Sequence, residues 1–300
     1  MNNPFVSVII PVFNDSERLK ICLQALENQT YPKGLYEVIV VDNGSEENIQ
    51  PLLSIFSQAK LINEIRPNSY AARNKGLSIA KGGVIAFTDA DCIPASDWIE
   101  KGVTNLLSVP NCGLVAGKIE IFYKNPGKPT AVELYESVIA FPQKYFVEVL
   151  KFGATANVFT FKSVIEHVDI FNDKLKSGGD TEWGQRVFSS GYKLIYADDT
   201  CIAHPGRYSL KDLYKKHIRL ARGQYNLTIE RSGYPLLKFL ENVYKELFPS
   251  LNSIHFITSN EIFKELNLEQ KIKVIMVGLS VRFLRVLEKL RLLFDGLKLT

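Results

Sequence analysis

The chain has few cysteines and little excess charge of either sign. Its four cysteines, Cys22, Cys92, Cys112 and Cys201, are scattered and form no CxxC pair. This spacing argues against a structural zinc site and against a disulfide framework, and it suits a reducing compartment. The net charge of +4 is too small to indicate nucleic-acid binding by itself, so we expect no nucleic-acid partner.

Long apolar runs and leader features are also missing. The sequence contains no stretch of about 18 or more uncharged apolar residues, so we predict no membrane-spanning helix. The first four residues, Met-Asn-Asn-Pro, lack the basic region of a signal peptide. No GxGxxG follows the first predicted strand, which excludes a dinucleotide-dependent oxidoreductase. We therefore expect a cytoplasmic protein.

The apolar residues, 46% of the chain, suffice for a core and follow a regular order. Strands and helices alternate over roughly the first 110 residues, which predicts an α/β fold with a parallel sheet and helices on both faces. We expect strands at 5–12, 36–41, 84–88, 113–121 and 192–197, and helices at 14–27, 52–59, 71–80, 98–107, 131–149 (broken near Pro142) and 181–190. Residues 211–300 are mostly helical and more basic, so we divide the chain into domains 1–210 and 211–300.

Two carboxylates, Asp89 and Asp91, follow the predicted strand 84–88. Side chains at i and i+2 of extended backbone point to the same side. Neighbouring carboxylates repel each other, and a divalent cation such as Mg²⁺ or Mn²⁺ relieves that repulsion while it holds phosphate oxygens. The pair predicts a metal–diphosphate site at the carboxyl end of a strand, where open α/β sheets bind ligands. The structural alternative is an N-cap for the helix 98–107.

Four segments stand in a fixed order along the chain. They are Val-Ile-Ile-Pro-Val-Phe-Asn (8–14), Val-Ile-Val-Val-Asp-Asn-Gly-Ser (38–45), Ala-Ala-Arg-Asn-Lys-Gly (71–76) followed by Asp89-Ala90-Asp91, and Gly-Gly-Asp-Thr-Glu-Trp (178–183) followed by His204. In this order they resemble the family 2 glycosyltransferases over residues 5–210. The resemblance implies a GT-A fold, which is Rossmann-like with a mostly parallel sheet flanked by helices, here with a helical C-terminal extension.

The resemblance also implies a reaction and a nucleotide site. The enzyme would be metal-dependent and inverting, and would move a sugar from a UDP-sugar to a hydroxyl of a glycan or lipid-linked acceptor. Asp42 would bind the uracil, Pro11 and Phe13 would line the base, and Asp15 would lie near the nucleoside. The structural alternative for Asp42 is a turn carboxylate that caps the next segment.

The diphosphate and metal residues are assigned in the same way. Arg73 would contact the diphosphate, a role that suits a guanidinium, or would be a solvated charge on a helix. Asp89 would contact the ribose or assist the metal through water. Asp91 would ligate Mn²⁺ or Mg²⁺, and His204 would be a second ligand, although a lone histidine is often structural.

Asp180 matches the catalytic base of inverting members, which takes the proton of the acceptor hydroxyl. The family often has Glu-Asp here, whereas this chain has Gly179-Asp180. Glu182 is a second candidate base, and Asp180 also fits a capping box that begins at Ser177. Three further residues are expected to face the acceptor, with a core position as the alternative for the last: Thr155, Asn157 and Trp183.

Two other functions compete with this interpretation. A nucleotidyltransferase shares the sheet and the metal site, but residues 11–18 lack its Gly-rich loop with Lys or Arg. An inactive nucleotide-sugar-binding scaffold would not need Asp180 together with the other carboxylates. Processive members of the family carry Gln-x-x-Arg-Trp, and this chain has only Arg219-Leu-Ala-Arg222-Gly223, which favours a non-processive, single-addition enzyme.

Residues 272–294 form a basic amphipathic pattern, with apolar residues in one sector and basic residues outside it. The apolar set is Ile272, Ile275, Met276, Leu279, Phe283, Val286, Leu287, Leu290 and Leu293. Such a helix predicts binding to a membrane surface, and the protein would then act on the inner face of the membrane. The alternative is a helix docked on the catalytic domain or on a second copy.

Overall fold

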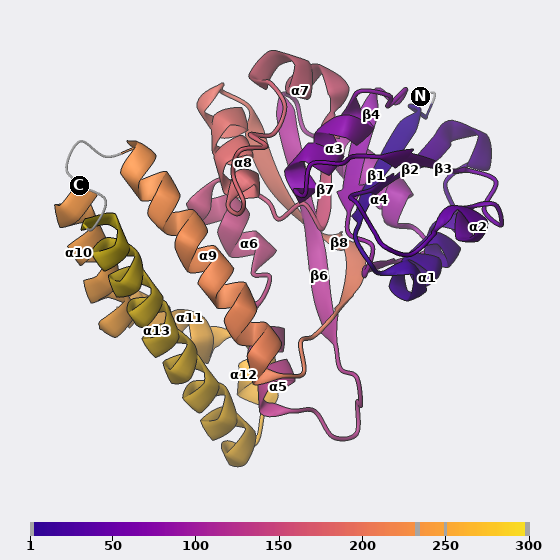
Figure 1. Cartoon of the computed structure of the whole chain (residues 1–300). Helices are drawn as coiled ribbons and strands as arrows, with labels where there is room; N and C mark the ends of the chain where they lie inside the picture. Colours follow the sequence, from indigo (N-terminus) through magenta and orange to yellow (C-terminus); the bar gives the residue numbers. More distant parts are fainter. Residues whose placement is uncertain (1–2, 232–234, 249–250, 298–300) are drawn as a thin grey trace. The chain divides into compact units, whose positions relative to one another are not determined.

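The computed structural model describes residues 3–231, 235–248 and 251–297 (Figure 1). The chain divides into two compact units, each built from separate stretches of sequence. The sheet unit comprises Met1–Glu120, Pro142–Leu175 and Gly179–His204, and the helical unit comprises Ile121–Phe141, Lys176–Gly178 and Pro205–Thr300. The domain boundary at residue 210 stays a prediction.

Eight strands form one sheet in the order β3-β2-β1-β4-β7-β6-β8-β5. The strands are β1 (Val6–Val12), β2 (Tyr36–Asp42), β3 (Ala59–Asn63), β4 (Val84–Thr88), β5 (Ile93–Pro94), β6 (Cys112–Phe122), β7 (Asn157–Phe161) and β8 (Lys193–Pro205). The strands predicted at 5–12, 36–41, 84–88 and 113–121 are confirmed, and the one predicted at 192–197 is longer than expected.

Four neighbouring strands of the sheet, β3, β2, β1 and β4, run parallel. Val8 of β1 lies opposite Val38 of β2 on one side and Ala86 of β4 on the other. Because parallel strands end at the same edge of a sheet, Asp42 at the end of β2 and Asp89 just after β4 reach one edge. This is the edge at which the sequence places the nucleotide.

The remaining strands make the sheet mixed rather than mostly parallel. Strand β7 pairs antiparallel with β4, β6 pairs antiparallel with β7, and β5 pairs antiparallel with β8. The helix predicted over 52–59 is wrong beyond Leu53, where α2 (Gln50–Leu53) ends, because residues from Ala59 join the sheet as β3. Strand β7 and the helix after it were not predicted.

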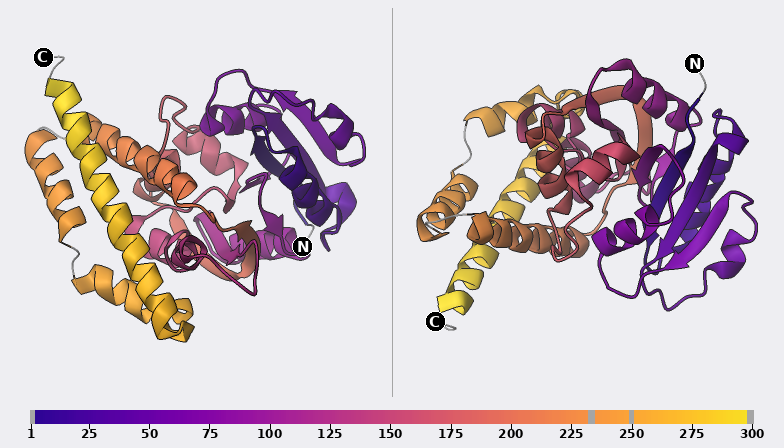
Figure 2. Two further views of the ribbon diagram at one scale, coloured as in Figure 1. Left: turned by 60° about the horizontal axis from the view of Figure 1, so that its bottom comes forward. Right: turned by 90° about the horizontal axis from the view of Figure 1, so that it is seen from above.

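Helices cover both faces of the sheet (Figure 2). On one face Ile9, Ile39 and Phe87 share a buried cluster with Leu77 of α3 (Ser69–Leu77) and Trp183 of α8 (Gly179–Ser189). On the other face α4 (Trp98–Ser108) packs against β7, where the ring centroids of Trp98 and Phe159 lie 4.7 Å apart. The sheet unit contains η1 (Lys33–Leu35), α1 (Ser16–Glu27), α2, α3 (Ser69–Leu77), α4 (Trp98–Ser108), α6 (Gln143–Tyr145), the π-helical η2 (Phe146–Leu150), α7 (Lys162–Val168) and α8 (Gly179–Ser189).

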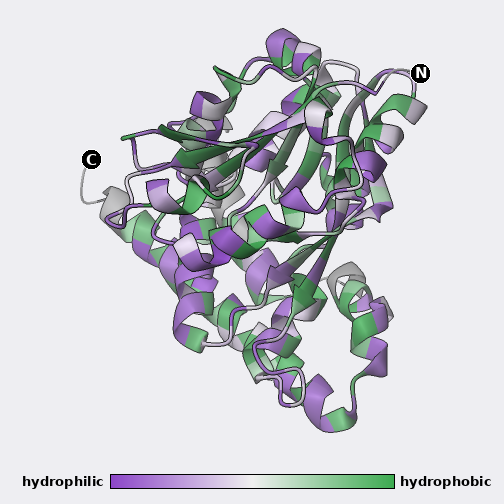
Figure 3. Ribbon diagram, turned by 90° about the vertical axis from the view of Figure 1, so that its right-hand side faces the viewer, coloured by the Kyte–Doolittle hydropathy of each residue, from purple (hydrophilic) through white to green (hydrophobic). Residues whose placement is uncertain are grey.

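Two glycines set the close approach of helices to the sheet. A Cβ on Gly76 of α3 would lie 2.5 Å from Cγ2 of Ile9, and one on Gly102 of α4 would lie 2.3 Å from the ring of Phe159. Only glycine fits at such distances. Strands of the sheet are predominantly apolar and the outer helices carry the polar residues (Figure 3), as burial on both faces requires.

The helical unit contains α5 (Ala131–Ile139), α9 (Leu210–Arg231), α10 (Pro235–Leu247), α11 (Leu251–Ser259), α12 (Glu261–Glu265) and α13 (Leu268–Leu297). Its core joins Tyr135 and Val138 of α5 to Leu213 of α9 and to α13. The carboxylate of Glu136 is buried there and accepts from Lys216 Nζ at 2.7 Å. The predicted break near Pro142 is confirmed, since α5 ends before it and α6 begins after it.

Helix α13 has two apolar faces. One face, with Val274, Val277 and Val281, is buried in the core of the helical unit. The other contains most of the sector predicted from the sequence, and these side chains are exposed: Ile272, Ile275, Met276, Leu279, Phe283 and Leu287. Basic residues between the two faces form ion pairs. Lys273 pairs with Glu269, and both Arg285 and Lys289 pair with Glu246. Among the described residues, none of the helices has the length and hydropathy needed to span a bilayer.

Candidate active site

Asp89 and Asp91 lie in a tight turn directly after β4. The backbone N–H of Cys92 donates to the carbonyl of Asp89 at 3.1 Å, which closes the turn. Burial raises the pKa of Asp89, and the charge of Asp91 adds to that rise, while Arg73 and His204 oppose it. The charge of Asp180 also raises this pKa, which places Asp180 within electrostatic reach of the turn.

Arg73 is the buried cation of this site. Its side chain is 5% exposed, and Nη2 donates to Oδ1 of Asp89 at 2.6 Å. The guanidinium lies 5.9 Å from the ring centroid of Tyr70. Its buried Nε has no hydrogen-bond partner among the described residues. The alternative of a solvated surface charge is therefore wrong for Arg73.

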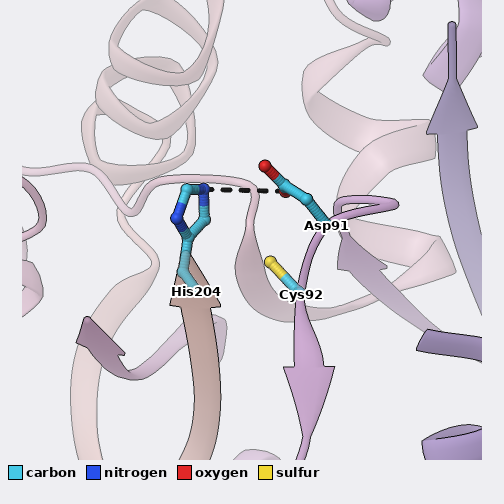
Figure 4. Close-up of side chains that lie close together, drawn as sticks. All are labelled: Asp91, Cys92 and His204. Atoms are coloured by element: carbon cyan, nitrogen blue, oxygen red, sulfur yellow. Dashed lines mark ion pairs between the residues drawn. The ribbon is translucent and has the colours of Figure 1, made fainter. Parts of the chain in front are cut away.

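Three potential metal ligands converge beside this pair (Figure 4). One ligand atom from each of Asp91, Cys92 and His204 lies within 4.8 Å of the others. Nε2 of His204, at the end of β8, is 3.6 Å from Oδ1 of Asp91. Arg18 of α1 lies 3.6 Å from the other oxygen of Asp91 and also donates to Asp15 at 2.8 Å. The structure thus brings Asp91 and His204 together, as the sequence analysis expected.

The residues expected around the base occupy the same edge of the sheet. Pro11 lies near the end of β1, opposite Val41 of β2, and Phe13 follows β1 with 60% of its surface exposed. An exposed aromatic ring at this position suits stacking on a nucleobase. Asp42 Oδ1 accepts from the backbone N–H of Ser45 at 3.0 Å, so this carboxylate does cap the following turn. The nucleotide roles of these residues stay predictions.

Asp180 lies in the first turn of α8, and two donors of Thr155 hold its carboxylate. Its Oδ2 accepts from both the backbone N–H and the hydroxyl of Thr155, each at 3.1 Å. The ring of Tyr70 packs against the preceding residue, because a Cβ on Gly179 would lie 2.7 Å from Cζ of Tyr70. Burial raises the pKa of Tyr70, and the charge of Asp180 raises it further, so the phenol is neutral near neutral pH.

Two of the three residues assigned to the acceptor have buried side chains that contact other residues of the fold. Asn157 is fully buried, and its amide bonds to Trp98 Nε1 at 2.8 Å and to the carbonyls of Lys118 and Thr200 at 2.8 and 2.9 Å. Trp183 is buried among aromatic rings, and its indole donates to the carbonyl of Asp169. The geometry favours a core position for both, while Thr155 touches the predicted base.

Sequence reasoning missed three residues of the site. Cys92 is adjacent to Asp91, and Arg18 follows Asp15 by one helical turn. Their positions in the sequence could therefore have placed both residues near the predicted site. Tyr70 gave no such signal, because its contact with Gly179 joins segments far apart in the chain. Glu182, the second candidate base, is paired with Arg186 at 2.9 Å.

Comparison with known proteins agrees with this geometry. Residues 7–168 match the family described as Glycosyl transferase family 2. The chain belongs to this family. It is 41% identical over 226 residues to Glycosyltransferase AglE of Haloferax volcanii, a match that covers 74% of this chain and 73% of that protein. It is 24% identical to a Methanococcus voltae dolichyl N-acetyl-α-D-glucosaminyl phosphate 3-β-D-2,3-diacetamido-2,3-dideoxy-β-D-glucuronosyltransferase, covering 77% of this chain and 75% of that protein.

Solved structures show the same fold at low sequence identity. The mannosyltransferase PcManGT from Pyrobaculum calidifontis, in complex with GDP-Man and Mn²⁺, gives a TM-score of 0.65 at 17% identity over 97% of this chain and 88% of that chain. S. aureus TarS 1–349 in complex with UDP gives 0.56 at 16% identity over 95% and 89%. The fold is GT-A and this family 2 member is a glycosyltransferase, which sets aside the nucleotidyltransferase and the inactive scaffold.

Proposed function

We propose that this enzyme is a metal-dependent, inverting, non-processive glycosyltransferase that moves a sugar from a UDP-sugar donor to a hydroxyl of a glycan or lipid-linked acceptor. The observation that carries the proposal is the placement of Asp180. Thr155 fixes its carboxylate at a distance from which its charge acts on Asp89, beside the cluster of Asp91 and His204. A base and a diphosphate site within reach of each other are what single-step transfer with inversion needs.

The residues present fit a divalent cation. The carboxylate of Asp91 and the imidazole of His204 form a ligand pair for such an ion, with atoms within 4.8 Å of each other. Burial raises the pKa of the adjacent Cys92 thiol, so this thiol stays protonated and is not counted as a ligand. Imidazole nitrogen suits Mn²⁺ better than Mg²⁺, so we favour Mn²⁺. When bound, the ion would place positive charge beside the departing diphosphate. The unpaired buried Nε of Arg73 supports the same site, since a phosphate oxygen would satisfy it.

The chemistry assigned to the chain's own residues is a proton transfer coupled to substitution. Asp180 accepts the proton of the acceptor hydroxyl while the hydroxyl oxygen forms a bond to the anomeric carbon of the sugar. The bond between that carbon and the diphosphate oxygen breaks, and its electron pair leaves with the diphosphate. Attack on the face opposite the leaving group inverts the configuration. Arg73 balances the negative charge of Asp89 at the donor.

Binding of UDP with and without Mn²⁺, measured by calorimetry, tests the donor and metal assignments. We expect Mn²⁺ to strengthen UDP binding, and Asp91→Asn to weaken the Mn²⁺-dependent binding about a hundredfold, since changing even the partners of metal ligands costs 10–100-fold. Asp173→Asn is the matched control, because Asp173 is an acidic residue of the sheet unit in an ion pair with Arg66. A UDP affinity that changes neither with Mn²⁺ nor with Asp91→Asn would refute the metal site. Binding of GDP or dTDP in place of UDP would refute the uridine assignment.

The exposed face of α13 supports a membrane-bound acceptor. Six large apolar side chains of one sector, including Leu279 and Phe283, are exposed on this helix, and contiguous exposed apolar surface marks interaction sites. The Methanococcus voltae relative is named for a dolichyl-linked substrate. Since the basic residues of α13 are largely paired, we propose that apolar contact rather than charge attaches it to lipid, and that the inner membrane face is the place of action.

Sedimentation with neutral and anionic lipid vesicles tests this attachment. Replacing Leu279 and Phe283 by serine should weaken vesicle binding at least tenfold, because burial of each side chain contributes roughly 1.5 kcal/mol or more. Ile55→Ser, which removes an equally exposed apolar residue of the sheet unit, should leave binding unchanged. Concentration-dependent self-association without vesicle binding would instead assign the face to a second copy of the chain.

A further inference from the structure

Each carboxylate of the turn after β4 has an arginine beside it, and the two arginines come from different helices. Nη2 of Arg73, from α3, donates to Oδ1 of Asp89 at 2.6 Å. Nη1 of Arg18, from α1, lies 3.6 Å from Oδ2 of Asp91. Because two carboxylates one residue apart repel each other, a cation beside each of them reduces the repulsion. The chain thus brings two positive charges of its own to the turn that is predicted to bind a metal and a diphosphate.

The two arginines differ in how firmly they are held. The side chain of Arg73 is 5% exposed, whereas that of Arg18 is 53% exposed. The contact between Arg73 and Asp89 is a hydrogen bond, and the ion pair between Arg18 and Asp91 is longer than one. An exposed ion pair of this kind contributes little free energy, so the guanidinium of Arg18 can leave Asp91 at small cost.

Arg18 also contacts the residue that is predicted to lie near the nucleoside. Its Nε donates at 2.8 Å to Oδ1 of Asp15, the N-cap residue of α1. The same guanidinium therefore contacts one carboxylate assigned to the nucleoside and another, that of Asp91, assigned to the metal. In a nucleotide sugar the diphosphate joins these two parts of the site. A guanidinium presents its N–H donors in a planar fork that matches phosphate oxygens.

A cation beside Asp91 has opposite effects on the two ligands of this site. Oδ1 of Asp91 faces His204, whose Nε2 is 3.6 Å away, and Arg18 approaches the other oxygen. A divalent ion between Asp91 and His204 would share its carboxylate with the guanidinium, and like charges repel. A diphosphate brings negative charge and acceptor oxygens, which attract the same guanidinium. Arg18 therefore disfavours the metal alone and favours the diphosphate.

We propose that Arg18 is a releasable counter-ion of Asp91, which opposes binding of Mn²⁺ alone and moves to the diphosphate of the sugar donor when nucleotide and metal bind together. The inference rests on the proposed function, in which Asp91 is a metal ligand and the donor is a UDP-sugar. Its consequence is cooperative binding. A diphosphate that draws Arg18 away from Asp91 raises the affinity for the metal, and the metal raises the affinity for the nucleotide by the same factor.

The test is the binding of each ligand to Arg18→Gln, which removes the charge and keeps a polar side chain. Binding of Mn²⁺ without nucleotide is measured from the electron paramagnetic resonance signal of free Mn²⁺, and binding of UDP at saturating Mn²⁺ by calorimetry. We expect Arg18→Gln to bind Mn²⁺ alone about threefold more tightly, the size of an exposed ion pair. We expect it to bind UDP with Mn²⁺ about tenfold more weakly, because a charged hydrogen bond to phosphate is lost.

The matched control is Lys33→Gln. It removes one positive charge from an exposed side chain of the sheet unit that pairs with Glu27 at 3.0 Å, and it should change neither affinity. A purely structural role of Arg18 in α1 would weaken the binding of both ligands or of neither. Binding of Mn²⁺ alone that is weaker or unchanged in Arg18→Gln would therefore refute the counter-ion role, and unchanged binding of UDP would refute the move to the diphosphate.

Failure of this inference is distinct from failure of the proposed function. If Asp91→Asn removes the effect of Mn²⁺ on UDP binding while Arg18→Gln keeps both wild-type affinities, Arg18 is not a counter-ion and the proposed metal site stands. If neither Mn²⁺ nor Asp91→Asn changes the affinity for UDP, the metal site and this inference fall together.

Discussion

Asp180→Asn should lower turnover about a thousandfold and leave the affinity for UDP within a factor of two. General base catalysis contributes roughly 10²–10⁴ in rate, and the amide cannot take a proton from the acceptor hydroxyl. The two donors of Thr155 can still bond to the amide oxygen, at the position where Oδ2 now accepts at 3.1 Å. The substitution therefore removes the base while keeping the local hydrogen bonds.

Glu182→Gln is the matched control for Asp180→Asn. Glu182 lies on the same helix and was the second candidate base, but Arg186 holds its carboxylate at 2.9 Å. We expect turnover of Glu182→Gln within a few fold of the wild type, measured by release of UDP under donor saturation. A large loss in Glu182→Gln with little loss in Asp180→Asn would move the base from one residue to the other.

Local sequence patterns predicted the strands that are buried on both faces of the sheet. They missed β3, which is a strand only because it pairs with a neighbouring strand. Strands β1, β2 and β4 are apolar runs bounded by turns, and the sequence marks them directly. Strand β3 lies at the edge of the sheet, mixes partly buried with exposed residues in no regular order, and includes Lys60, so its residues carry no clear period. It forms a strand because its backbone hydrogen bonds to β2, and a local sequence pattern carries no information about such a partner.

The residues of the site likewise include some that the local sequence predicted and some that it did not. Asp89 and Asp91 were predictable because a strand end places them together within three residues of chain. Asn157 was predicted to face the acceptor because a polar residue beside small ones resembles a sugar contact. In the structure the hydrogen bonds of its side-chain amide all go to residues of the fold, which favours a structural role. Tyr70 was missed because its partner lies on α8, and only the three-dimensional packing against Gly179 connects them.

Removing Arg73 should destabilise the sheet unit even when no nucleotide or metal is present. Breaking a fully buried ion pair costs about 3–5 kcal/mol, and for Arg73→Met we expect about 2 kcal/mol because the side chain of Asp89 is 33% exposed. The cause is the charge left on Asp89 beside Asp91, with burial already raising the pKa of Asp89. Methionine keeps apolar volume against Tyr70, so a cavity is not the source of the loss. Urea unfolding at neutral pH in the presence of a chelator measures the effect.

The double variant Arg73→Met/Asp89→Asn separates charge from packing. If the uncompensated carboxylate causes the loss, the asparagine should recover most of the free energy of unfolding lost in Arg73→Met. Lys101→Met is the control on the cation side, because Lys101 pairs with Asp199 at 3.8 Å and both side chains are exposed, so it should change stability little. Equal stability of the single and double variants would mean that Arg73 acts by packing alone.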